Sequence, residues 1–266
     1  MHLPSFCLLA AAALLSAGCA TRDGGSQSPP QPDTSPITRS QEPTLQQRAQ
    51  IRVDLAAGYY ERGQMDVALD ELKEAVRLDP ANARIYNIYG LVYTVMGDRA
   101  KAEENFRRAV EMAPNDSEIR HNWGAFLCTT GRGREGIAEL DRAITNPLYR
   151  STETALINAG KCSAQIGDYT AADRYFRQAL TVSPNNAVAA YNLALLAFRE
   201  SHFDQARAWM RPVMQQSAPP PEALYLGMCI ERKQGDRQAE LSYTSQLRNR
   251  YPESAEAKAL PGGNCE

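Results

Sequence analysis

Side chains with reactive or metal-binding groups are sparse in this chain. The three histidines, His2, His121 and His202, lie too far apart in sequence to form a metal-ligand motif. Gly131–Gly136 reads GRGREG and fits G-x-G-x-x-G, but a dinucleotide site needs that string between a strand and a helix. Here it follows a helix expected over Trp123–Thr130, so we interpret it as a turn. No H-E-x-x-H, C-x-x-C or G-x-S-x-G motif is present. We therefore predict no enzyme activity, cofactor, metal or small-molecule substrate.

The balance of charges excludes a further class of partner. The 266 residues include 29 basic and 31 acidic side chains, for a net charge of −2. A chain without excess positive charge has no electrostatic reason to bind nucleic acid or an anionic membrane surface. We expect no nucleic-acid partner.

Small and aromatic residues recur along the chain with a fixed period. In residues 83–116 they are Tyr89-Gly90, Tyr93, Gly97, Ala102, Phe106, Ala109 and Pro114. One period earlier they are Leu55-Ala56, Tyr59, Gly63, Ala68, Leu72, Ala75 and Pro80. Such spacing lets two antiparallel helices interlock, and it is the tetratricopeptide pattern of about 34 residues. The sequence predicts an all-α fold, a right-handed α-solenoid of tetratricopeptide repeats with two antiparallel helices each.

Six repeats fit between residues 45 and 252. Their expected ranges are 49–82, 83–116, 117–152, 153–186, 187–220 and 221–253. The third is two residues longer because of an insertion in NPLYRST, and Pro219-Pro220-Pro221 ends the fifth. The sixth is less regular, and we place its Gly235 one residue out of register. Residues 254–266 form a C-terminal tail.

The N-terminus has the features of a targeting segment. Leu8–Leu15 reads LLAAAALL, which is too short to span a bilayer, and small residues follow it. Ala17-Gly18-Cys19 resembles a bacterial lipobox, in which lipid is attached to the cysteine thiol before cleavage. This predicts a signal peptide over residues 1–18 and a lipid-anchored Cys19. An ordinary cleaved signal that contains a cysteine is the alternative. Ala20 after the cysteine favours sorting to the outer membrane.

Residues 19–44 are expected to form a tether behind the lipid. The stretch 21–43 has five prolines, a single isoleucine and no aromatic residue. Such a segment cannot bury enough apolar surface to fold. Its end-to-end distance should be on the order of 30 Å, so the folded part would remain near the membrane.

The first helix of each repeat should line the concave groove of the solenoid. Asn122, Asn158 and Asn192 occupy the sixth position of three successive repeats. A carboxamide both donates to and accepts from a peptide backbone, so this series could hold a partner segment. The alternative is that the asparagines bond to neighbouring helices. The other predicted partner-binding residues of the groove are Arg84, Asn87, Leu91, Tyr191, Leu195 and Phe198.

Four cysteines lie in the expected repeats and tail. Cys128 and Cys162 both come late on first helices that should be neighbours in the array, so we predict a disulfide between them. The alternative is two buried thiols. Cys229 and Cys265 could pair if the tail folds back. The sequence leaves that open, and we favour free thiols there.

Three segments resemble one particular family. They are HNWGAFLCTTGR (121–132), NPLYRSTETALINAGKCSAQIGD (146–168) and YNLALLAFRESHFDQARAWM (191–210). They are similar to the type IV pilus biogenesis and stability lipoproteins of the PilF/PilW type, across about residues 45–252. Cys128 and Cys162 fall at that family's cysteine positions. The resemblance implies a Gram-negative outer-membrane pilotin on the periplasmic face, which binds pilus secretin subunits and promotes their localisation and multimerisation.

A different class of function shares the same features. A lipid-anchored repeat protein could also act as a periplasmic scaffold for cell-envelope enzymes, either of peptidoglycan or of outer-membrane assembly. Anchor, tether and solenoid would be the same in both cases. Genetic neighbourhood or a motility phenotype would separate the two.

Overall fold

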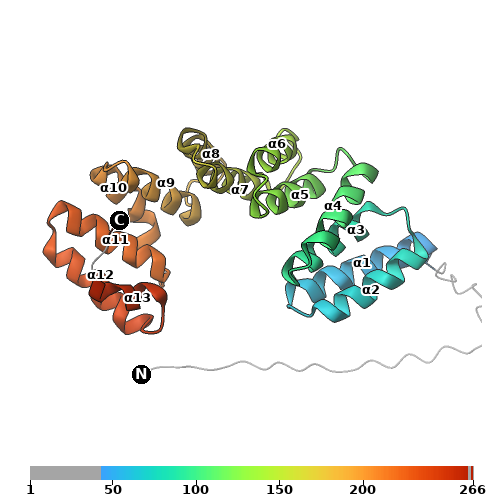
Figure 1. The fold of residues 1–266 in the computed structure, drawn as a ribbon, viewed down its shortest axis with the longest axis horizontal. Coiled ribbons are helices and arrows are strands. Elements are labelled where there is room, and N and C mark those ends of the chain that lie inside the picture. Colours follow the sequence, from blue (N-terminus) through green and yellow to red (C-terminus); the bar gives the residue numbers. More distant parts are fainter. Residues whose placement is uncertain (1–42, 263–264, 266) are drawn as a thin grey trace, which may run out of the picture. The chain divides into compact units, whose positions relative to one another are not determined.

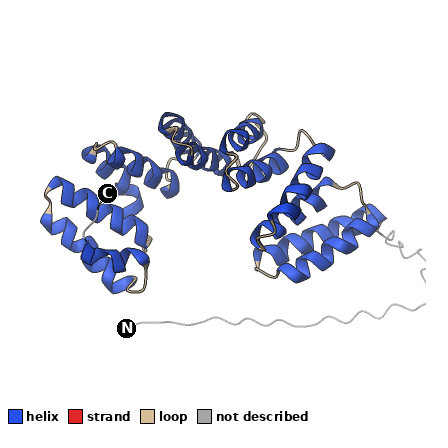
Figure 2. Cartoon of the chain, in the orientation of Figure 1, coloured by secondary structure: helices blue, strands red, loops and turns tan. Residues whose placement is uncertain are grey.

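The computed structural model describes residues 43–262 and Cys265. The predicted signal peptide, Cys19 and tether lie outside the described residues. Figure 2 shows helices and loops throughout the described part, with no strand among residues 43–262. The predicted all-α solenoid fold is confirmed.

Twelve helices form six antiparallel pairs, followed by a short helix and a 3-10 turn (Figure 1). Pairs one to three are α1 (Leu45–Glu61) with α2 (Met65–Leu78), α3 (Ala83–Val95) with α4 (Arg99–Met112), and α5 (Ser117–Thr129) with α6 (Gly133–Ile144). Pairs four to six are α7 (Thr152–Gln165) with α8 (Tyr169–Val182), α9 (Ala187–Arg199) with α10 (Phe203–Met214), and α11 (Pro221–Gln234) with α12 (Arg237–Arg250). The chain continues into α13 (Ala255–Ala259) and η1 (Leu260–Gly262).

Each helix pair turns on one residue in the left-handed backbone conformation. In five of the six pairs this residue is glycine. In the pair α9–α10 it is Ser201, whose φ is 62°. The series is Gly63, Gly97, Gly131, Gly167, Ser201 and Gly235. Gly235 follows Ser201 at the regular interval, so our placement of Gly235 out of register is wrong. The G-x-G-x-x-G string begins at Gly131 in the turn between α5 and α6, but its last four residues form the first turn of α6, so the interpretation as a turn holds only for Gly131 and Arg132.

Helix starts are set by side-chain caps. Asp98, Asp116, Asp168 and Asp236 each accept a hydrogen bond from a backbone N–H in the first turn of the helix that follows. Such a cap satisfies donors that have no partner within the helix. Thr44 and Gln47 form a capping box at α1, which begins before the first repeat that the pattern marks.

Small residues allow the two helices of a pair to approach closely. A Cβ at Gly90 would lie 2.6 Å from the Phe106 ring, and one at Gly160 would lie 2.6 Å from the Phe176 ring. Both rings are almost fully buried. The apolar core therefore runs between the helices of each pair and on into the next pair.

The first helices of successive pairs lie against one another. Contacts join α1 to α3, α3 to α5, α5 to α7, α7 to α9, α9 to α11 and α11 to α13. The second helices pack mainly against the first helix of their own pair and of the next. The first helices therefore form the inner layer, and its exposed face is the surface on which a partner segment could lie.

Candidate partner-binding surface

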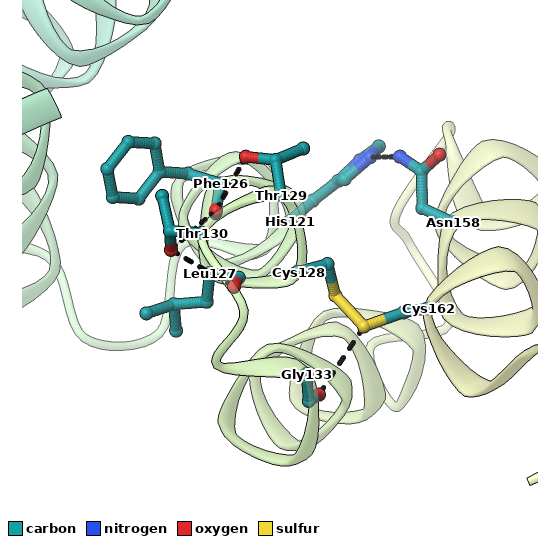
Figure 3. Close-up of a disulfide and its surroundings, with 9 residues drawn as sticks. All are labelled: His121, Phe126, Leu127, Cys128, Thr129, Thr130, Gly133, Asn158 and Cys162. Carbon is teal, nitrogen blue, oxygen red and sulfur yellow. Dashed lines mark hydrogen bonds between the residues drawn. A yellow bond between two sulfur atoms is a disulfide. The ribbon is translucent and has the colours of Figure 1, made fainter. Parts of the chain in front are cut away.

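A disulfide joins neighbouring first helices in the middle of the array. Cys128 on α5 and Cys162 on α7 are bonded with an S–S distance of 2.05 Å and a Cα–Cα distance of 5.6 Å (Figure 3). Cys162 is 1% exposed. Its sulfur lies 3.4 Å from the Gly133 carbonyl oxygen, a contact without a donated proton because a disulfide sulfur carries none.

Glycines beside this disulfide make room for it. A Cβ at Gly136 would lie 2.5 Å from the Cys128 sulfur, and one at Gly133 would lie 2.5 Å from the Ile166 side chain. The sequence predicted a turn for Gly133, whereas Gly136 is also at the repeat position of Ala102, where the two helices of a pair meet. They also let α6 pack closely against α5 and α7, because a side chain at either position would displace neighbouring atoms.

The three asparagines of the predicted series form hydrogen bonds within the protein itself. Asn122 donates to Asn87 of the preceding repeat over 3.2 Å, and Asn87 is 3% exposed. The Asn158 amide lies 2.8 Å from His121 Nε2 (Figure 3). Asn192 instead donates to the Val188 carbonyl of its own helix. Bonding to neighbouring helices, the alternative interpretation, thus describes Asn122 and Asn158.

His121 is the centre of a buried polar cluster between α5, α7 and the NPLY insertion. Its Nε2 accepts from Asn158, so Nδ1 carries the proton and donates to the Tyr149 hydroxyl at 2.5 Å. Burial lowers the pKa of His121 to about 4 and raises the pKa of Tyr149 to about 12. Both groups are therefore neutral at pH 7, and their role is to position the insertion.

The predicted groove residues of repeat two are largely engaged. Arg84 lies 3.4 Å from the Asp54 carboxylate in an exposed ion pair. Leu91 is half-buried and packs against the core. With Asn87 buried, Arg84 is the member of this set that projects toward solvent.

The predicted residues of repeat five lie together at a cavity. Tyr191, Leu195 and Phe198 of α9 line a space of about 410 Å³ between α9, α11 and α13. Residues that sequence analysis did not assign complete its wall: Glu222, Tyr225, Leu226, Cys229, Ala255, Glu256, Ala259 and Cys265. An adjoining space of about 300 Å³ shares Tyr191 and Glu222 and extends to Asn192 and Lys161.

A second disulfide closes the far side of this cavity. Cys229 on α11 is bonded to Cys265, with a Cα–Cα distance of 5.4 Å. The expectation of free thiols is therefore wrong. Tail residues after α12 fold back, and Leu260 and Ala257 pack into the C-terminal core cluster with Leu224. Burial of these apolar groups holds Cys265 next to Cys229.

The repeat period itself was the signal for the missed residues. Tyr225 and Ala259 follow Tyr191 at successive intervals of the period, and Glu256 follows Glu222 in the same way. The tail was excluded from the array because it lacks the repeat's aromatic and glycine landmarks. Extending the register beyond residue 253 would have placed α13 beside α11.

Two further properties of the described residues concern membranes and metals. Among residues 43–262, no helix combines the length and apolar character needed to cross a membrane. The same part of the chain holds no cluster of three or more histidine, cysteine or acidic side chains suited to a metal ion.

Comparisons with known proteins agree on the repeat class. Models of the tetratricopeptide repeat match residues 58–97, 83–116, 165–226 and 223–254. The chain is 27% identical to the type IV pilus assembly protein PilF of Pseudomonas aeruginosa over 204 residues, which is 77% of this chain and 81% of that protein.

Solved structures show the same similarity. The crystal structure of PilW, described as a widely conserved type IV pilus biogenesis factor, is 28% identical with a TM-score of 0.73. That match covers 80% of this chain and 97% of PilW. A structure of Pseudomonas aeruginosa PilF is 25% identical with a TM-score of 0.75, covering 83% of this chain and 99% of that one.

Proposed function

Since the chain belongs to the tetratricopeptide-repeat proteins and is homologous to PilF, of the type that serves type IV pilus biogenesis, we propose that it is a pilotin. In this role it binds subunits of the pilus secretin, brings them to the outer membrane and promotes their assembly into a ring. The observation that carries the proposal is similarity to PilF over 77% of the chain, along the whole array rather than in one repeat.

The parts of the chain divide this work physically. Lipid on Cys19 supplies the address, and more than one acyl chain on that residue makes anchoring durable. The proline-rich segment up to residue 44 supplies reach. The solenoid supplies a partner-specific face, and anchoring raises the local concentration of any bound subunit at the membrane.

The arrangement of polar groups suits binding rather than catalysis. Both cysteine pairs of the described part are bonded, and His121 is a neutral, buried hydrogen-bonding group. The cavity at α9 is lined by apolar side chains with two carboxylates. Such a site orients an apolar segment of a protein partner.

The test follows the secretin in membrane fractions. A deletion strain is complemented with the wild type, Cys19→Ala or Cys7→Ala, and the secretin is immunoblotted without boiling. We expect high-mass rings to vanish in the deletion, to move to the inner membrane with Cys19→Ala, and to be normal with Cys7→Ala, which lies outside the lipobox. Rings of unchanged amount and location in every strain would refute the proposal.

A further inference from the structure

The C-terminal segment is a shortened first helix of a seventh repeat. α13 begins at Ala255, one period after Pro221 begins α11, but it has 5 residues where α11 has 14. It lies against α11 as the other first helices lie against their predecessors. The chain then turns through η1 and returns to α11 through the Cys229–Cys265 disulfide. The last groove of the array is thus built by helices in normal register.

The cavity in this groove results from a change of side-chain size. Tyr191 and Tyr225 occupy one register position on α9 and α11, whereas Ala259 occupies it on α13. A methyl group there leaves open the space that a third tyrosine ring would fill. The result is the cavity of about 410 Å³, with Leu195 at 43% exposure among its lining residues.

Two carboxylates line the cavity. Glu222 and Glu256 both line it, and neither forms an ion pair among the described residues. Burial, and then the carboxylates of Glu222 and Glu256, raise the pKa of Tyr191, which lines the same cavity. An apolar wall with two carboxylates that form no ion pair in the described part of the chain matches a segment that carries an apolar side chain and a cation.

We propose that this cavity binds a segment of the partner protein in which an aliphatic or aromatic side chain lies next to lysine or arginine. The inference rests on the proposed function, in which that partner is the secretin. The apolar side chain of the segment enters the cavity and packs against Tyr191, Leu195 and Phe198 of α9. Burial of this anchor supplies most of the affinity. The neighbouring cation faces Glu222 and Glu256 and fixes the direction of the segment.

Two synthetic peptides test the chemistry of the cavity. Both are fluorescein-labelled 12-residue helices with leucine and phenylalanine four residues apart, flanked in one by lysine and in the other by glutamate. Binding to the full chain in detergent is followed by fluorescence anisotropy. We expect the lysine peptide to bind at least ten-fold more tightly than the glutamate peptide. Equal affinities would overturn the inference.

Charge-reversed variants separate this site from the net charge of the protein. Glu222→Lys/Glu256→Lys should reverse the preference between the two peptides. Glu61→Lys/Glu104→Lys changes the net charge equally at exposed positions outside the cavity and should leave the preference unchanged. Leu195→Ser should weaken both peptides about ten-fold. A control variant that loses the preference as fully as the cavity variant would contradict the proposal. Circular dichroism shows that each variant is folded.

Co-purification of the secretin distinguishes this inference from the proposed function. Secretin bound by the wild type and by Glu61→Lys/Glu104→Lys, but not by Glu222→Lys/Glu256→Lys, supports both. Secretin bound equally by all three proteins supports the pilotin role and overturns the cavity as its docking site. If no protein binds secretin while the lysine peptide keeps its preference, the pilotin role fails and the cavity's chemistry stands.

Discussion

At the scale of single residues, His121 couples the stability of the fold to pH. Its pKa is about 4 in the folded protein and 6.5 for an ordinary histidine. Below pH 6.5 the unfolded chain binds a proton that the folded chain does not, so the histidine's contribution to stability is complete above pH 6.5. It is lost progressively as the pH falls toward 4, by up to about 3 kcal/mol.

The measurement is the free energy of unfolding in urea between pH 4 and pH 7. His121→Gln is the matched variant, because glutamine keeps one donor and one acceptor and does not titrate. Subtracting its profile removes the effect of carboxylates that titrate in the same range. Parallel profiles for wild type and variant would contradict the assignment.

Ser201 is the position where the repeat's turn departs from glycine. Its φ of 62° lies in the left-handed region, which costs a residue with a Cβ about 1–2 kcal/mol. Ser201→Gly removes that cost but adds freedom to the unfolded chain, so we expect a gain of roughly 0.5–1 kcal/mol in the free energy of unfolding.

The reverse substitution provides the control for Ser201. A Cβ at Gly167 would meet no atom within 4 Å, so Gly167→Ser tests backbone conformation alone. It should destabilise by about as much as Ser201→Gly stabilises. Thermal unfolding of the three proteins is the measurement, and a destabilised Ser201→Gly protein would refute the explanation.

At the scale of elements, the close approach of α7 and α8 depends on Gly160. Gly160→Ala would bring a methyl group to 2.6 Å from the buried Phe176 ring, so the helices must separate. We expect a loss of about 1–3 kcal/mol. In Gly58→Ala on α1, the nearest atom to the new methyl group would be 3.6 Å away, on the flexible Arg62 side chain. This substitution should stabilise by about 0.5–1 kcal/mol because alanine favours a helix. Chemical denaturation measures both; similar effects at the two sites would contradict this contrast.

The disulfide between α5 and α7 should contribute to stability by restricting the unfolded chain. It closes a loop over a sequence separation of 34 residues. In the chain-entropy model such a loop contributes about 4 kcal/mol. Cys128→Ser/Cys162→Ser should therefore lower the melting temperature, and reductant should bring the wild type down toward it. If neither the double substitution nor the reductant changed the melting temperature, a stabilising role of the disulfide would be excluded.

At this scale, the sequence predicted those features in which the residue pattern follows directly from helix packing. The helix pairs follow because a small residue at the Gly90 position recurs with a large apolar residue at the Phe106 position, as Gly160 does with Phe176. The role of Asn122 and Asn158 did not follow, because a carboxamide at that position serves a partner or a neighbouring helix equally well. Which of the two roles it takes depends on the polar residue on the preceding first helix, which is Asn87 for Asn122 and His121 for Asn158.

At the scale of the whole molecule, the sequence determined the array more fully than its end. The period defines which helix lies next to which, so α5 and α7 could be paired before their structure was known. The tail carries the register without the landmark residues, and its place beside α11 depends on burial of Leu260 and on the bond to Cys265. Such a contact becomes visible only in three dimensions.

Helices that contact only their neighbours give way one after another when a chain is pulled from its ends. The two disulfides divide that response. Residues between Cys128 and Cys162, and between Cys229 and Cys265, are bypassed by a covalent link and carry no load. Each disulfide reduces the length of the fully extended chain by on the order of 120 Å. In an optical trap the oxidised chain should stop lengthening about 240 Å short of the reduced one. Residues 128–162 and residues 229–265 therefore remain loops of limited size under a force that extends the first repeats completely.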